Sequence, residues 1–114
     1  MVSVHTNAGD DPMANGSESF YSTVAPSPDS AVLAQNVLTR VVSLGLRNRG
    51  VKRTNFNIIN TSMPSALIEV AFHTNSVLAS GQNITNEGFL NDGPLRALAG
   101  KAIADGIKDY YATR

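Results

Sequence analysis

The sequence has 114 residues, which is enough for one domain with a modest core and also fits part of a larger domain. Nine Lys and Arg residues balance nine Asp and Glu residues, so the net charge of zero favours neither nucleic acid nor an anionic membrane as a partner. No apolar stretch approaches the roughly 20 residues that cross a bilayer, and the first residues do not resemble a signal peptide. Without Cys, any metal site would use His, Asp or Glu.

Two short strands are predicted near the amino terminus. Residues 2–5 (VSVH) alternate apolar and polar side chains, the period-two pattern of a strand. A second strand is predicted over residues 17–23 (SESFYST), after turn signals at residues 9–12 and 15–16. The first strand is therefore expected to end on His5, directly before a loop.

A helix is predicted next, with Ser27 as N-cap and Pro28 at the first helical position. It is expected to continue to Gly45, because apolar residues recur at helical spacing: Ala34, Val37, Leu38, Val41 and Leu44. Residues 46–53 are then predicted to form a basic loop, which leads to an apolar stretch at residues 56–59.

The second half of the sequence predicts another strand and another helix. Residues 66–72 (ALIEVAF) are the strongest strand candidate, and the sequence after Asn75 is rich in Asn and Gly and resembles a loop. A final helix is predicted from residues 92–94 (DGP), with one apolar stripe formed by Leu95, Leu98, Ala102, Ile103, Ile107 and Tyr110. Strands interleaved with helices predict an α/β fold in which helices cover a sheet.

His5 is the first candidate functional residue. Ligands of α/β proteins gather at the carboxyl ends of strands, and His5 is predicted to lie at such an end. Imidazole is a common metal ligand, although an isolated histidine is more often a hydrogen-bonded structural residue. The position alone therefore allows both interpretations.

Glu69 is the second candidate, because it interrupts an otherwise apolar strand. Holding an ionised carboxylate in a dry interior costs on the order of several kcal/mol unless a cation or donors compensate. Glu69 could reach water or pair with Lys52 or Arg53, or it could be a general base whose pKa is tuned by burial. His73 would point to the same face if the strand continued that far.

The predicted basic loop carries four cationic residues, Arg47, Arg49, Lys52 and Arg53. Such a cluster is usually a solvated surface. The alternative is contact with an anionic ligand, and a carboxylate would be a suitable one.

Several stretches together resemble the carboxyl-terminal part of the zinc-dependent N-acetylmuramoyl-L-alanine amidases of bacterial cell-wall turnover, sporulation and phage lysis. They are SVHTNAG, GSESFY, the run from LAQNVLTRVV to VAFHTN, and KAIADGIKDYY. The order of GLRNRGVKR, MPSALIEVAF and a Thr-Asn pair carries most of this resemblance. It implies an open, twisted, mixed sheet flanked by helices. It also implies hydrolysis of the amide between the lactyl group of N-acetylmuramic acid and L-alanine.

Carried over to this sequence, the resemblance implies that His5 is a ligand of Zn²⁺ and that Glu69 is the catalytic carboxylate. Zinc with three protein ligands and an open position activates water, and Glu69 would accept the proton of that water and return it to the leaving amine. Asn7, Arg53 and His73 are the candidate substrate-binding residues. The implied substrate is peptidoglycan or its muropeptides, and the implied location is the cell envelope, the periplasm or the outside of the cell.

The sequence also departs from the family pattern. The two other zinc ligands of the family, a histidine and a glutamate, lie upstream of the SVHTN-like stretch, where this sequence has only Met1 and Val2. We therefore expect residues 1–114 to be the carboxyl-terminal portion of one catalytic domain, monomeric when complete, and to bind zinc weakly or not at all in isolation. His73 and residues 76–91 differ from the family as well. We expect these differences to affect substrate preference and not the fold. The alternative function is a non-catalytic module that binds peptidoglycan or a partner.

Overall fold

The computed structural model describes residues 1–25 and 27–114. Its strands are β1 (Val2–Asn7), β2 (Ser17–Ser22), β3 (Asn48–Thr54) and β4 (Ala66–Phe72). Its helices are α1 (Pro28–Val42), the single 3₁₀ turn η1 (Asn57–Ile59), α2 (Asn86–Asn91) and α3 (Gly93–Ala112). None of the helices in this described part of the chain combines the length and the apolar character that crossing a bilayer requires.

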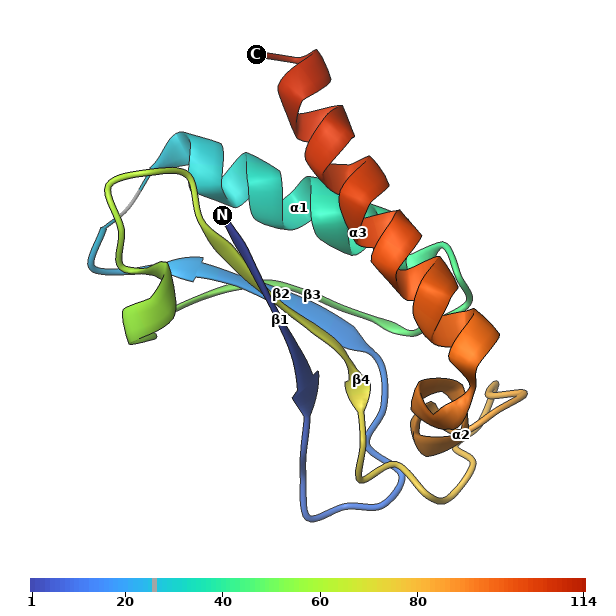
Figure 1. Cartoon of the computed structure of the whole chain (residues 1–114). Coiled ribbons are helices and arrows are strands. Elements are labelled where there is room, and N and C mark those ends of the chain that lie inside the picture. Colours follow the sequence, from blue (N-terminus) through green and yellow to red (C-terminus); the bar gives the residue numbers. More distant parts are fainter. Residues whose placement is uncertain (26) are drawn as a thin grey trace.

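The strands form one mixed sheet in the order β1-β4-β2-β3. β1 is parallel to β4 and β2 is parallel to β3, whereas β2 and β4 are antiparallel. The sheet is open and twisted, and α1 and α3 lie together on one of its faces (Figure 1). The predicted fold class, a mixed α/β sheet flanked by helices, is therefore confirmed.

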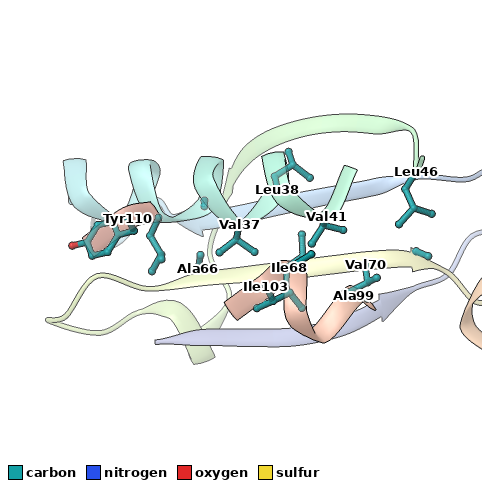
Figure 2. Close-up of a cluster of buried hydrophobic side chains, with 14 of the residues drawn as sticks. Val37, Leu38, Val41, Leu46, Ala66, Ile68, Val70, Ala99, Ile103 and Tyr110 are labelled. Atoms are coloured by element: carbon teal, nitrogen blue, oxygen red, sulfur yellow. The ribbon is translucent and has the colours of Figure 1, made fainter. Parts of the chain in front are cut away.

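The core lies between this sheet face and the two helices. Val37, Leu38 and Val41 of α1 are fully buried and pack with Ile68 of β4 and Ile103 of α3 (Figure 2). Burying each such side chain stabilises the fold by about 1.5–3 kcal/mol. These contacts therefore hold the helices to the sheet. The helical spacing of the apolar residues predicted both helices.

The predicted apolar stripe of the last helix is only partly correct. Leu98 is 46% exposed and lies outside the core, whereas Ala102, Ile103 and Tyr110 are buried. Tight packing between α1 and α3 depends instead on Gly106, where an added Cβ would lie 2.6 Å from the Cα of Val37. The two helix backbones approach so closely there that only hydrogen fits.

Two predicted element boundaries and two predicted loops were wrong. β1 continues past His5 to Asn7, so this strand does not end on the histidine. The first helix ends at Val42, and Gly45 follows it in a turn with φ of +97°. The predicted basic loop is mostly the edge strand β3, where charged side chains are tolerated because one side of the strand faces water. The loop-like region after Asn75 contains the short helix α2.

Candidate active site

The face of the sheet opposite α1 and α3 carries three ionisable side chains in a row. His5 of β1 is paired in register with Glu69 of β4, and Glu69 is paired with Glu18 of β2. Residues paired across neighbouring strands point to the same face, with their Cβ atoms about 4.5–5.5 Å apart. The pairing therefore brings His5 and Glu69 together, although 63 residues separate them in the sequence.

A groove of about 520 Å³ lies on this face. His5, Leu67 and Glu69 line it from the sheet, and residues 55–58 line it from the segment that follows β3 and enters η1. Within that segment Phe56 is 39% exposed and Ile58 is 50% exposed. The groove thus combines an imidazole and a carboxylate with an apolar wall, as small-molecule and peptide sites commonly do.

Glu69 has the environment of a functional carboxylate. Its Oε2 atom is buried and has no hydrogen-bond partner in the part of the chain that the structure describes. Burial raises the pKa of Glu69 above its ordinary value; the nearby His5 and His73 oppose this change, and the charge of Glu18 adds to it. Because a raised pKa makes a carboxylate a better proton acceptor and donor near neutral pH, the group suits general acid–base catalysis.

The ion pair that the sequence allowed between Glu69 and Lys52 or Arg53 is not formed within the described part of the chain. Lys52 pairs with Glu18 instead, and the guanidinium of Arg53 lies 5.7 Å from the centre of the Tyr21 ring. Arg53 is in register with Tyr21, whose ring packs against the core on the helix side of the sheet. The sheet therefore separates Arg53 from the groove, and its position does not suit the predicted contact with substrate there.

His5 has an exposed side chain, and its Nε2 atom lies 2.8 Å from Oγ of Ser3. His73 follows β4 directly, and its Nδ1 atom lies 2.9 Å from Oγ1 of Thr6. His73 is near enough to influence the pKa of Glu69, but it is not one of the residues that line the groove. Of the two histidines, His5 lines the groove together with Glu69 and His73 does not.

The side-chain amide of Asn7 is already hydrogen-bonded within the protein. Its Nδ2 atom donates to Oε1 of Glu18 at 2.8 Å, and its Oδ1 atom accepts from the backbone nitrogen of Ala8 at 2.8 Å. Both ends of the amide are thus engaged in holding β1 to β2 and in shaping the turn after β1. The contact of Asn7 with substrate therefore stays a prediction.

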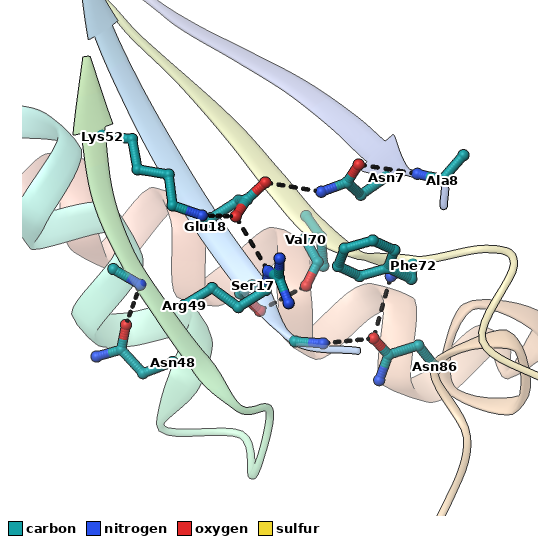
Figure 3. A network of polar contacts seen from close by, with 12 residues as sticks. Asn7, Ala8, Ser17, Glu18, Asn48, Arg49, Lys52, Val70, Phe72 and Asn86 are labelled. Carbon is teal, nitrogen blue, oxygen red and sulfur yellow. Dashed lines mark hydrogen bonds and ion pairs between the residues drawn. The ribbon is translucent and has the colours of Figure 1, made fainter. Parts of the chain in front are cut away.

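A polar network beside Glu69 was missed by the sequence analysis. Glu18 is buried and accepts hydrogen bonds from Asn7, from Nε of Arg49 at 3.0 Å and from Nζ of Lys52 (Figure 3). Burial raises the pKa of Glu18, but the bonds from Lys52 and Arg49 outweigh burial and hold this pKa below its ordinary value. The only signal in the sequence was a second carboxylate inside a predicted strand, and it does not identify the partners Arg49 and Lys52 on another strand.

The residues of the groove fit only part of a metal site. Among residues 1–25 and 27–114, no three His, Cys, Asp or Glu side chains form a group that could hold a metal ion. The exposed imidazole of His5 can serve as one ligand, and the unpartnered carboxylate of Glu69 stands beside it. A catalytic zinc ion normally has three protein ligands, so a complete site needs donors beyond those described here.

Similar sequences and structures agree on one family. The amidase LytC of Bacillus subtilis (strain 168) is 38% identical over 112 residues, which are 96% of this chain and 21% of LytC. An N-acetylmuramoyl-L-alanine amidase from Clostridium difficile 630 superposes with a TM-score of 0.83 at 28% identity, over 99% of this chain and 57% of that one. The catalytic domain of CwlV from Bacillus (Paenibacillus) polymyxa var. colistinus does so with a TM-score of 0.75 at 29% identity, again over 99% and 57%.

The chain therefore spans about a fifth of LytC and little more than half of these two solved structures. The profile of the N-acetylmuramoyl-L-alanine amidase family matches residues 1–109, which is nearly the whole sequence. Together with the mixed sheet, this match shows that the chain belongs to the N-acetylmuramoyl-L-alanine amidase family.

Proposed function

We propose that this chain supplies the general base and one zinc ligand of an enzyme that hydrolyses peptidoglycan at the amide between N-acetylmuramic acid and L-alanine. The observation that carries the proposal is the position of Glu69, whose buried Oε2 lacks a hydrogen-bond partner among the described residues and lies beside His5 in an open groove. Membership of the amidase family supports the choice of the bond that is cleaved.

Glu69 would carry the proton transfers of the reaction. Its carboxylate would take a proton from the attacking water and return it to the amine nitrogen of the alanine, so that the amide separates into a lactyl carboxylate and a free amine. The raised pKa of Glu69 helps the second transfer, because a more basic carboxylate holds the proton until the amine can accept it. When bound, zinc would supply water of lowered pKa and polarise the scissile carbonyl.

His5 would hold the zinc ion through its imidazole, with Ser3 positioned to orient the ring. We infer that the other ligands lie outside these 114 residues, which would then form the carboxyl-terminal portion of one catalytic domain that is monomeric when complete. The 57% share of two solved amidase chains supports this inference. A peptidoglycan substrate places the proposed enzyme in the cell envelope, the periplasm or outside the cell.

The test is Glu69→Gln in the full-length protein, with zinc content measured by elemental analysis and muropeptide cleavage followed by chromatography. We expect hydrolysis to fall about 10²- to 10⁴-fold, the usual contribution of a general base, while zinc content stays unchanged. Glu87→Gln is the control, because Glu87 is an exposed carboxylate on α2. Full activity of the Glu69 variant would refute the assignment. Muropeptide binding without cleavage by the wild type would favour the non-catalytic module.

A further inference from the structure

A second pocket lies against the loop that follows β4. It has a volume of about 520 Å³ and is lined by residues 44–47, which follow α1, by residues 79–84, and by Asn15 and Asn86. Other residues line the groove of Glu69, so the two sites are separate. Residues 79–84 belong to the segment 76–91, which departs from the family pattern.

Side-chain amides hold this loop in place. Oε1 of Gln82 accepts from the backbone nitrogen of Ala79 at 2.7 Å, and Nε2 of Gln82 donates to Oδ1 of Asn75 at 2.9 Å. Asn75 is fully buried and donates to the carbonyl oxygens of Pro12 and Val77. The pocket is therefore preformed, which lowers the entropic cost of binding a ligand.

Two buried amides in the pocket wall each have one free polar atom. Oδ1 of Asn86 accepts from the backbone nitrogens of Gly16 and Phe72, so its Nδ2 atom points away from both (Figure 3). Nδ2 of Asn15 donates to the carbonyl oxygen of Met13 at 3.0 Å, which leaves Oδ1 of Asn15. Among the described residues, neither this oxygen nor Nδ2 of Asn86 has a hydrogen-bond partner.

Both free atoms are accessible from the pocket. Asn15 is 5% exposed and Asn86 is 2% exposed, and both residues line the pocket. In the described chain the enclosed side-chain polar atom without a partner is Oε2 of Glu69, so the two amide atoms are not enclosed. Because Gly16 follows Asn15 and contacts Asn86, the free donor and the free acceptor lie near each other in the pocket wall.

The lining favours an uncharged ligand that carries an amide and a small apolar group. Leu44 and Ile84 supply apolar surface, and Arg47, which is exposed, is the one ionisable residue among those that line the pocket. The free oxygen of Asn15 would repel a carboxylate or a phosphate. A secondary amide instead offers its carbonyl oxygen to Nδ2 of Asn86 and its N–H to Oδ1 of Asn15.

We propose that this pocket binds an N-acetylated hexosamine through its acetamido group. The methyl of that group contacts the apolar surface, and the sugar hydroxyls face Ser80 and Asn83 of the loop. The volume lies within the range of about 300–1,000 Å³ that is typical of small-ligand sites. The glycan strand of peptidoglycan carries such sugars, so the pocket is a second binding site for this polymer, independent of the role of Glu69.

The test is saturation-transfer NMR on the full-length protein, with N-acetylglucosamine and glucosamine as probes. We expect saturation of the acetamido methyl group, and binding of glucosamine at least about tenfold weaker, because it lacks the amide. Asn86→Asp should weaken the binding of N-acetylglucosamine at least about tenfold, because it replaces the free donor with an acceptor and keeps the oxygen that accepts from the backbone. Asn91→Asp, the same change at the exposed end of α2, is the matched control and should bind as wild type.

Absence of binding by the wild type, or unchanged affinity in Asn86→Asp, would overturn the proposal. Equal binding of N-acetylalanine methylamide, which has secondary amides but no sugar ring, would overturn the assignment to a sugar. If a thermal melt shows that Asn86→Asp has lost its fold, Asn15→Ala decides instead. Loss of the free acceptor should weaken binding about two- to tenfold, and unchanged affinity would refute the proposal. The readout is binding, so the result holds whether or not the protein cleaves muropeptides.

Discussion

The close approach of α1 and α3 at Gly106 gives a sharp test of the fold. In Gly106→Ala the new Cβ would lie 2.6 Å from the Cα of Val37 and 2.9 Å from the carbonyl oxygen of Asn36. Carbon atoms normally pack 3.5–4.0 Å apart, so the helices would have to separate by about 1 Å. Both clashing atoms belong to the backbone of α1 and cannot move aside by a change of rotamer.

The expected magnitude follows from two opposing effects. Overpacking costs about 1–3 kcal/mol, and a clash with backbone places this substitution at the upper end. Alanine regains about 1 kcal/mol of helix propensity over glycine, so the net loss of stability should be about 2 kcal/mol. The matched control is Gly100→Ala in the same helix, where an added Cβ meets nothing within 4 Å and the propensity gain of up to about 1 kcal/mol should remain.

Urea denaturation of the 114-residue chain, followed by circular dichroism, measures both variants. The two free energies of unfolding should differ by about 3 kcal/mol, with Gly106→Ala below the wild type and Gly100→Ala above it. Equal unfolding free energies for the two variants would show that α1 and α3 do not approach each other as the structure describes.

Two further predictions concern buried polar groups. Because the pKa of Glu69 is raised in the folded chain, its ionisation is disfavoured by folding, and stability should fall as pH rises above the ordinary value of 4.5. Glu69→Gln should therefore raise the urea concentration at the midpoint of unfolding at pH 7 but not at pH 4. An equal shift of this midpoint at both pH values would contradict the burial of this carboxylate. Asn86 accepts hydrogen bonds from the backbone nitrogens of Gly16 at 2.8 Å and Phe72 at 3.0 Å. Asn86→Ala should lower the unfolding free energy by about 2–4 kcal/mol, and Asn86→Asp, which keeps an acceptor, should lose less.

The sequence predicted the parts of the fold that depend on apolar periodicity. The α1 helix, the α3 helix and the β4 strand were predicted because their buried residues repeat at the spacing of a helix or form a continuous apolar run. β3 was missed because an edge strand tolerates charges, and its cations conceal the alternation. α2 was missed because it is shorter than two turns and is recognisable mainly by the Thr85 cap, whose Oγ1 accepts from the nitrogen of Gly88.

The site was predictable to a similar extent. Glu69 stood out because a carboxylate inside an apolar strand needs an explanation, and the resemblance to a family drew attention to His5. The role of Glu18 could not be predicted, because its partners Arg49 and Lys52 lie on another strand and only the sheet order brings them together. The same sheet order explains why Arg53, one residue after Lys52, lies on the opposite face.

The central claim is that His5 binds zinc beside Glu69 when the catalytic domain is complete. Anomalous diffraction at the zinc edge from crystals of the full-length protein locates the metal directly. We predict an anomalous peak about 2.0–2.1 Å from a ring nitrogen of His5, with Glu69 in the same groove and not among the ligands. A zinc peak bound by other residues, with His5 outside its coordination shell, would contradict the account.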